Sequence, residues 1–138
     1  MGTQDNVQVV KQGYAAFGRR DIPGLVALLA EDVEWHIPGE GPSFAGTYHG
    51  HKEVTNFFQN LARELDIQDF QPREFVAEGD HVMVIGWERA KLKSTNRTIE
   101  LDWVMDFTVR NGKIAKFRQY TDTQAIAKAY AESAKTAR

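Results

Sequence analysis

Cysteine is absent from this chain of 138 residues. Its absence excludes disulfides, thiol nucleophiles and zinc sites with cysteine ligands, and it agrees with a reducing compartment. Long apolar runs are also missing: nowhere do about 18 apolar residues follow one another, as a membrane-spanning helix requires. The first residues, MGTQDNVQVVKQGYAAF, do not have the pattern of a secretory signal peptide. We therefore expect a cytoplasmic protein without a membrane partner.

Concentrated charge of one sign is lacking as well. The 17 lysines and arginines nearly balance the 19 aspartates and glutamates, the formal net charge is -2, and no block of like charge occurs. Nucleic-acid binding normally requires a basic patch, so we expect no nucleic-acid partner. The length suits one domain, placed at residues 1–138, with a core of useful size. We expect no cofactor.

Apolar residues at helical spacing predict three helices in the first half of the chain. The predicted ranges are about 4–18, 23–30 and 51–65. Asp21 is the expected N-cap of the second helix, which has Pro23 in its first turn. The third range carries the clearest apolar stripe of the chain.

Strand signals follow a different period. The stretch VEWHIPGEGPSFAGTYHGH, residues 33–51, begins with the alternation of a short strand, which the Pro-Gly pair ends. Beyond residue 68 the apolar period becomes two, and the turn signals EGD, TNR and NGK separate four strands. These four strands predict an antiparallel meander. The alanine-rich residues after it, 123–138, are expected to be helical at their start and frayed at their end.

Helices followed by a meander predict an α+β fold, with the helices packed on one face of a curved antiparallel sheet. One strand defines that face best, because its apolar residues alternate with polar ones. The residues expected to face the helices are Leu101, Trp103, Met105, Phe107 and Val109.

Three segments then carry a family resemblance. The order of elements, with AEDVEWHIPG, AGTYHGHKEV and VRNGKIAKFRQYTDT, resembles the SnoaL-like branch of the nuclear-transport-factor-two-like superfamily. The resemblance covers nearly the whole chain. It implies a cone-shaped, cystatin-like fold and a deep hydrophobic pocket between the concave sheet and the helices. This fold also serves ketosteroid isomerases, limonene-epoxide hydrolases, polyketide cyclases and non-enzymatic binders, so function must be argued from the site.

The resemblance also implies a homodimer joined through the outer face of the sheet. On the strand orientation expected from the sequence, that face carries Val82, Val84, Val104 and Tyr120.

The catalytic groups of ketosteroid isomerases are not matched. The proton-shuttling carboxylate corresponds to Ile37, the oxyanion-stabilising acid to Met105, and the tyrosine of the first helix to Gly13, with Tyr14 one residue away. Proton transfer from carbon requires a positioned base, so we expect no isomerisation of 3-oxo-steroids.

The catalytic groups of limonene-epoxide hydrolases are matched in part. Their arginine corresponds to Arg89, while their two aspartates correspond to Lys91 and Gln119. We expect Arg89 and Gln119 to be the functional polar groups, with Arg89 as electrophile and Gln119 orienting water or substrate. The alternative for Arg89 is a solvated residue near the end of a strand.

The expected wall of the pocket is largely aromatic. The residues expected in this wall could equally belong to the ordinary hydrophobic core, since pocket wall and core are the same surface near the mouth of such a pocket. The expected lining residues are Tyr14, Phe17, Trp35, Ile37, Phe58, Ile85, Trp87, Trp103, Met105, Phe117 and Thr121.

The histidines offer a competing kind of site. His49, His51 and Glu53 resemble half of a cupin-type metal site. They also suit a solvated loop followed by a helix N-terminus, and we expect no metal. Asp106 and Asp122 are expected to have structural roles, the latter as a helix cap.

Three functions remain open at this stage. The first is an isomerase, cyclase or hydrolase acting on a small apolar, oxygen-bearing molecule. The second is a non-catalytic protein that binds such a molecule, and the third is a dimeric scaffold that uses the outer sheet face. The sequence does not decide whether the chain is an enzyme.

Overall fold

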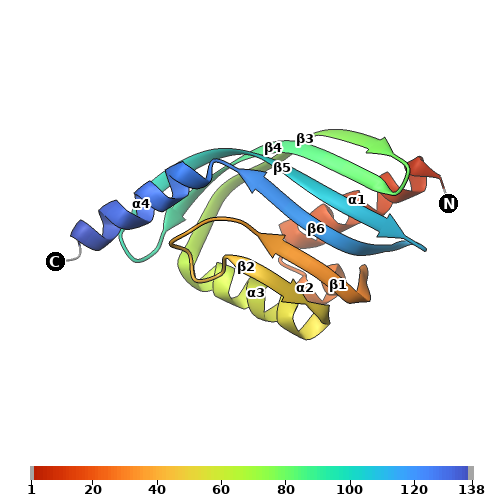
Figure 1. The fold of residues 1–138 in the computed structure, drawn as a ribbon, viewed down its shortest axis with the longest axis horizontal. Coiled ribbons are helices and arrows are strands. Elements are labelled where there is room, and N and C mark those ends of the chain that lie inside the picture. Colours follow the sequence, from red (N-terminus) through yellow and green to blue (C-terminus); the bar gives the residue numbers. More distant parts are fainter. Residues whose placement is uncertain (1, 137–138) are drawn as a thin grey trace.

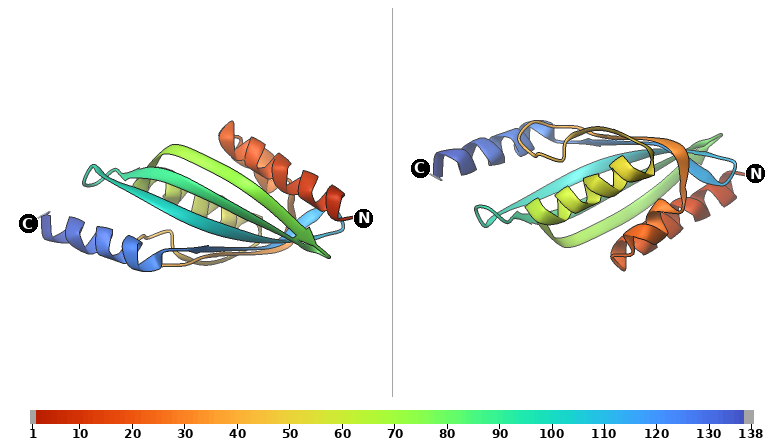
Figure 2. Two further views of the ribbon diagram at one scale, coloured as in Figure 1. Left: turned by 90° about the horizontal axis from the view of Figure 1, so that it is seen from above. Right: turned by 90° about the horizontal axis from the view of Figure 1, so that it is seen from below.

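A curved sheet with helices on its concave side forms the structure (Figures 1 and 2). The computed structural model describes residues 2–136, with side chains through residue 131. The elements are α1 (Thr3–Gly18), α2 (Ile22–Val26), β1 (Leu29–Ile37), β2 (Gly46–His49), α3 (Gly50–Glu64), β3 (Leu65–Glu78), β4 (His81–Leu92), β5 (Arg97–Arg110), β6 (Lys113–Thr121) and α4 (Thr123–Thr136). The expected α+β class and the helices on one face are confirmed.

The sheet has six strands in the order β2-β1-β6-β5-β4-β3. Strands β3 to β6 form the predicted antiparallel meander. The early strand β1 joins it through β6, and this pair is parallel, with Trp35 opposite Phe117. Along the chain, α1 and α2 precede β1, and α3 follows β2. Helices α1, α2 and α3 all lie on the same side of the sheet (Figure 2).

Two boundaries differ from the sequence prediction. The second helix ends at Val26 and not near residue 30, because Leu29 already belongs to β1 and lies opposite Ile114 of β6. Strand β3 begins at Leu65, directly after α3, whereas the sequence predicted strands only beyond residue 68. Its polar first half is held by pairing along β4, where Leu65 lies opposite Leu92. Strand β2, which pairs with β1 as a hairpin, was not predicted.

Helix caps behave as their residue types predict. Oδ1 of Asp21 accepts a hydrogen bond from the backbone N–H of Gly24 at 2.9 Å, at the start of α2. Oδ1 of Asp122 accepts from the N–H of Ala125 at 2.9 Å, at the start of α4. The predicted helical start of the C-terminal segment is therefore confirmed, while residues 137–138 lie outside the described residues. In the described part of the chain, no helix combines the length and apolar character needed to cross a membrane.

Strand β4 has the opposite orientation to the one expected. Val82 and Val84 are 0% exposed and face the helices, whereas Ile85 lies on the outer face of the sheet. The cause is at Gly86, since a Cβ there would lie 2.4 Å from Cη2 of Trp103. The indole of Trp103 therefore occupies the space above Gly86, and this contact fixes which face of β4 is inside.

Candidate pocket between the sheet and the helices

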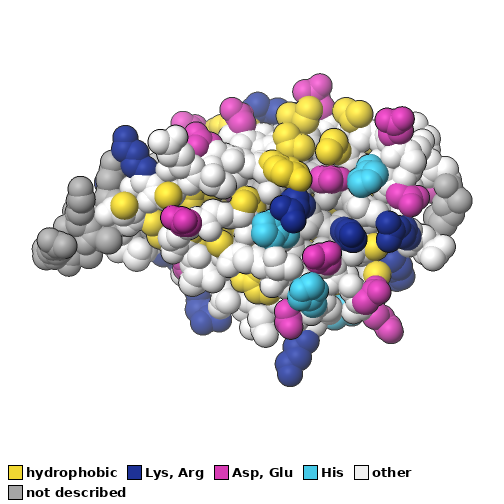
Figure 3. Space-filling model, viewed as in Figure 1, with side chains coloured by type: hydrophobic (Ala, Val, Ile, Leu, Met, Phe, Trp, Pro, Cys, Tyr) yellow, Lys and Arg dark blue, Asp and Glu magenta, His cyan; other side chains and the backbone are white. Residues whose placement is uncertain are grey.

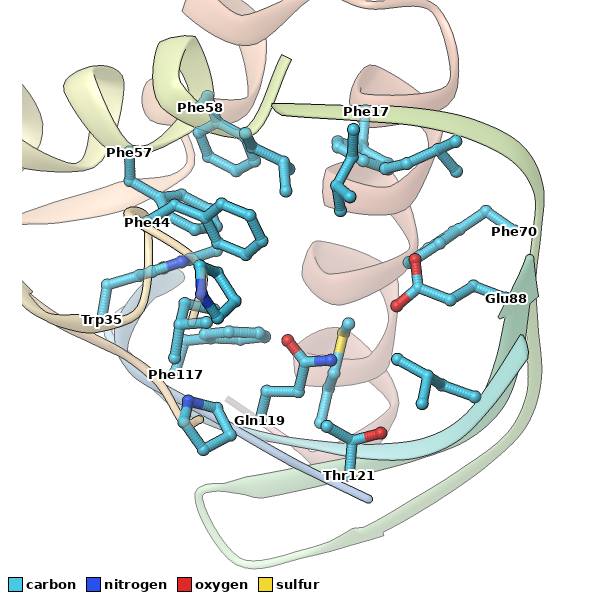
Figure 4. A pocket seen from close by; sticks show the side chains of 18 of the residues that line it. Phe17, Trp35, Phe44, Phe57, Phe58, Phe70, Glu88, Phe117, Gln119 and Thr121 are labelled. Atoms are coloured by element: carbon cyan, nitrogen blue, oxygen red, sulfur yellow. The ribbon is translucent and has the colours of Figure 1, made fainter. Parts of the chain in front are cut away.

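A cavity of about 120 Å³ lies between the concave side of the sheet, α1 and α3. Aromatic rings surround much of it, and its side chains come from every layer of the fold (Figure 4). The structure places nine of the sequence-predicted residues around it: Tyr14, Phe17, Trp35, Ile37, Phe58, Met105, Phe117, Gln119 and Thr121.

Four predicted residues lie elsewhere. Ile85, Trp87 and Arg89 project from the outer face of β4, so their expected inward orientation is wrong. Trp103 is buried but is not among the residues that line the cavity, and its ring stacks on Phe70 with a centroid distance of 5.1 Å.

Arg89 has its own partners on the outer face. Its Nε donates a hydrogen bond to Oε1 of Gln68 at 3.3 Å, and its guanidinium lies 5.7 Å from the ring centroid of Trp87. Arg73 lies over the same ring at 5.5 Å. The two arginines and the tryptophan thus form an exposed cation–π cluster, and the cavity has no arginine in its described lining.

Glu88, the residue before Arg89, takes the inward position. Its side chain is 9% exposed and extends from β4 into the cavity, opposite Trp35 and Phe117 (Figure 4). Burial raises the pKa of this carboxyl from 4.5 to about 7. No hydrogen bond or ion pair to Glu88 is found within the described part of the chain, so this acid is both buried and available.

Sequence reasoning missed Glu88 because the match of Arg89 to the arginine of limonene-epoxide hydrolases placed Arg89 inward, together with Ile85 and Trp87 on the same parity. A signal was present, since Val82, Val84, Gly86 and Glu88 share one parity with Ala90. A glycine in mid-strand marks close approach by another group, here Trp103, and this would have favoured the correct face.

Tyr14 is the second polar group of the cavity wall. Its hydroxyl donates to Sδ of Met105 at 3.2 Å, and burial raises its pKa above the ordinary value. Thioether sulfur is a weak acceptor, so a better acceptor on a ligand can take over this donor. Gln119 extends its amide into the cavity from β6, and the Thr121 hydroxyl is already bonded to the carbonyl of Asp102 at 2.8 Å.

Three segments meet at one end of the cavity. Pro42 and Phe44 of the loop 38–45, together with Tyr130 of α4, belong to the lining and were not predicted from the sequence. Glu64, at the end of α3, accepts hydrogen bonds from the Ser43 hydroxyl and from the Tyr130 hydroxyl. This carboxylate therefore joins the loop, α3 and α4 beside the cavity.

The His49–Glu53 segment has structural contacts of its own. Oε1 of Glu53 accepts a hydrogen bond from the backbone N–H of His49 at 2.8 Å, at the start of α3. His51 Nε2 lies 2.9 Å from the carbonyl oxygen of Leu29. Across the described residues, no three His, Cys, Asp or Glu side chains gather where they could hold a metal ion.

The cavity can therefore surround an apolar molecule with rings and meet it with a few polar groups. Those groups are the carboxyl of Glu88, the hydroxyl of Tyr14 and the amide of Gln119. The described lining contains no lysine, arginine or histidine. Fold and cavity together define an α+β protein with an apolar pocket enclosed by a curved sheet.

The particular family follows from comparison with known proteins. The profile of the SnoaL-like domain matches residues 10–117, and the chain therefore belongs to this family, within the nuclear-transport-factor-two-like (NTF2-like) superfamily.

The chain is also similar to solved structures and to a curated protein. An NTF2-like protein from Burkholderia xenovorans LB400 is 48% identical, with a TM-score of 0.87 over 94% of this chain and 98% of that one. TerC, crystallised with polyporic acid, is 32% identical, with a TM-score of 0.79 over 88% of this chain and 95% of that one. An uncharacterised protein of Mycobacterium tuberculosis is 24% identical over 83% of this chain and 87% of its own length.

Proposed function

We propose that this protein binds a small, mostly apolar, oxygen-bearing molecule in the cavity between the sheet and the helices. The observation that supports it most directly is the composition of the wall, in which aromatic rings surround a few polar side chains. Ligand pockets commonly have this composition. The cocrystal of TerC with polyporic acid, in a protein 32% identical to this one, also favours an organic ligand.

Cavity size narrows the proposed ligand. About 120 Å³ is close to the roughly 150 Å³ of an engineered apolar cavity that takes up benzene. The proposed ligand is therefore a molecule with a single ring, or one of similar volume. A larger ligand would require loop 38–45 and α4 to move apart. Gln119 is proposed to orient the oxygen of that molecule, because its amide can donate to a carbonyl and accept from a hydroxyl.

Arg89 is not part of this proposal, because it lies on the outer face with Gln68. We also do not propose the isomerisation reaction of ketosteroid isomerases, because the catalytic groups of that family are not present at the corresponding positions. Ile37 and Met105, at the corresponding positions, present only apolar atoms and a thioether to the cavity.

The test is calorimetric titration with single-ring ligands, using two matched aliphatic-to-tryptophan variants. Leu61→Trp fills space at the cavity wall, while Ile85→Trp adds the same side chain to the outer face. The proposal predicts binding to the wild type and to Ile85→Trp, and at least tenfold weaker binding to Leu61→Trp. Equal affinities for all three proteins would place the ligand outside the cavity and refute the proposal.

A second part of the proposal concerns assembly. We infer a homodimer through the outer sheet face, where Val76, Met83, Ile85 and Tyr120 expose between 40% and 58% of their surface. Figure 3 shows hydrophobic side chains gathered over the upper strands of this face, next to histidine and basic side chains. Val82 and Val84, which the sequence suggested for this contact, lie inside and take no part in it.

A further inference from the structure

We propose that Glu88 makes this cavity a site for uncharged carbonyl compounds, which it holds as a neutral carboxylic acid donating a hydrogen bond to the carbonyl oxygen. The inference rests on the proposed ligand-binding function of the cavity and specifies its ligand class. It begins from geometry: the carboxyl projects from β4 into the apolar cavity and has no partner among the described residues (Figure 4).

No positively charged side chain is among the described residues that line the cavity around Glu88. Its neighbours across the sheet are Phe70 on β3 and Leu101 on β5, both apolar. The titratable side chains in the described lining from other elements are Tyr14 on α1 and Tyr130 on α4, and neither is cationic. The raised pKa, about 7, has burial as its only cause, in agreement with the absence of a nearby charge. At and below neutral pH, much of Glu88 is therefore a neutral hydrogen-bond donor.

Two other side chains of the wall carry hydrogen-bond donors. The hydroxyl of Tyr14 is bonded only to a thioether, and the amide of Gln119 extends into the cavity. The protonated carboxyl of Glu88 adds a third donor. A carbonyl oxygen is an acceptor only, so it suits this set better than a ligand whose polar group is itself a donor.

Charged ligands fit less well, for two different reasons. A carboxylate would bring negative charge next to Glu88, with no cationic side chain among the described residues of the wall to offset it. An ammonium ion could pair with ionised Glu88, but both charges would then lose their water in an apolar cavity. The neutral pair of a carboxylic acid and a carbonyl avoids both costs.

The proposal is tested with four ligands of similar size: acetophenone, benzoate, benzylamine and toluene. Calorimetric affinities are measured from pH 6 to pH 8.5 for the wild type. Acetophenone is expected to bind more tightly than benzoate and benzylamine at pH 6. Its affinity should fall by up to about 30-fold by pH 8.5, because only about 3% of a group with a pKa of about 7 is then protonated. Toluene should show no such dependence.

Three variants identify the group responsible. Glu88→Gln keeps a donor that does not ionise, so its affinity for acetophenone should be independent of pH. Glu88→Leu should bind toluene as the wild type does and acetophenone at least tenfold more weakly. Glu100→Gln removes a carboxyl from an exposed position of β5 and should keep the wild-type profile.

Each contrary outcome has a distinct meaning. Tighter binding of benzylamine with rising pH would overturn the carbonyl assignment in favour of a cation site. A wild-type pH profile in Glu88→Gln would show that another group titrates. Binding of acetophenone without any dependence on pH, and with equal affinity in Glu88→Leu, would refute the role of Glu88 while preserving the proposed function. No binding of any of the four would refute both for single-ring ligands.

Discussion

Glu88 couples the stability of this fold to pH. Its carboxyl has an ordinary pKa of 4.5 and a folded-state pKa of about 7, so between these values the folded state binds more protons than the unfolded state. The free energy of unfolding must then fall as pH rises from about 4.5 to about 7 and level off above that. At 1.36 kcal/mol per pH unit the loss is about 3 kcal/mol.

Urea unfolding at pH 5 and at pH 8 measures this loss. Glu88→Gln should remove most of the decrease and should be more stable than the wild type at pH 8, because it buries no charge. Glu100→Gln, at an exposed position, should leave the decrease in place. Identical pH profiles for wild type and Glu88→Gln would show that Glu88 is hydrated in solution and not buried.

Gly86 is the residue whose lack of a side chain fixes the face of β4. An added Cβ would lie 2.4 Å from Cη2 of Trp103 and 2.6 Å from the carbonyl oxygen of Gln71. One of these neighbours is backbone, so it cannot simply rotate away. We expect Gly86→Ala to lower the free energy of unfolding by about 1–3 kcal/mol, the usual range for an overpacked core.

Gly18 provides the matched control for Gly86. It lies at the end of α1, and nothing is within 4 Å of where its Cβ would stand. Gly18→Ala is expected to be neutral or to stabilise by about 0.4–1 kcal/mol. Chemical denaturation of the two variants checks both values, and equal effects would mean that the contact with Trp103 does not restrict β4.

At the scale of elements, Glu64 joins the segments at one end of the cavity. Its carboxylate accepts hydrogen bonds from Ser43 in loop 38–45 and from Tyr130 on α4. Gly41 lies against the same tyrosine, where an added Cβ would be 2.6 Å from Tyr130 Cβ. These contacts hold the loop and α4 together.

Replacing Glu64 by alanine should therefore loosen this end of the cavity. The loss of about 1 kcal/mol per hydrogen bond predicts amide hydrogen exchange in residues 41–45 that is faster by about fivefold or more. Glu74→Ala, at an exposed position of β3, should not change it. Unchanged exchange in Glu64→Ala would show that packing against Tyr130, and not the carboxylate, holds the loop.

At the scale of the whole molecule, the outer sheet face is the surface through which we infer a homodimer. Met83 and Ile85 are 40% and 41% exposed in the single chain, although they are large and apolar. If two copies cover this face, Ile85→Glu places a charge in the contact and should convert a dimer to a monomer. Sedimentation at micromolar concentration gives the result, since an interface of standard size persists there.

Lys52→Glu is the control for the sedimentation experiment. It reverses a charge at an exposed position on α3, away from the outer sheet face. This variant should sediment as the wild type does. A wild-type monomer at micromolar concentration would contradict the inferred dimer directly.

The sequence by itself determined most of the architecture. Apolar stripes at a period of 3.6 located α1 and α3, and turn signals located the meander, because these patterns depend on neighbours within one element. Asp21 and Asp122 identified two helix starts for the same reason. Strand β5 showed its inner face clearly, since its apolar residues alternate with charged ones.

Only the tertiary structure decided which charged side chain of β4 faces the cavity. Both faces of β4 carry apolar residues, so alternation alone left two orientations, and they differ by which of Glu88 and Arg89 points inward. The choice depends on the contact of Gly86 with Trp103, which belongs to the neighbouring strand and is paired with it. A one-residue change of parity exchanges every side chain between the two faces of a sheet. Here it replaced an expected cation by a buried acid, and so changed the class of ligand that we propose for the cavity.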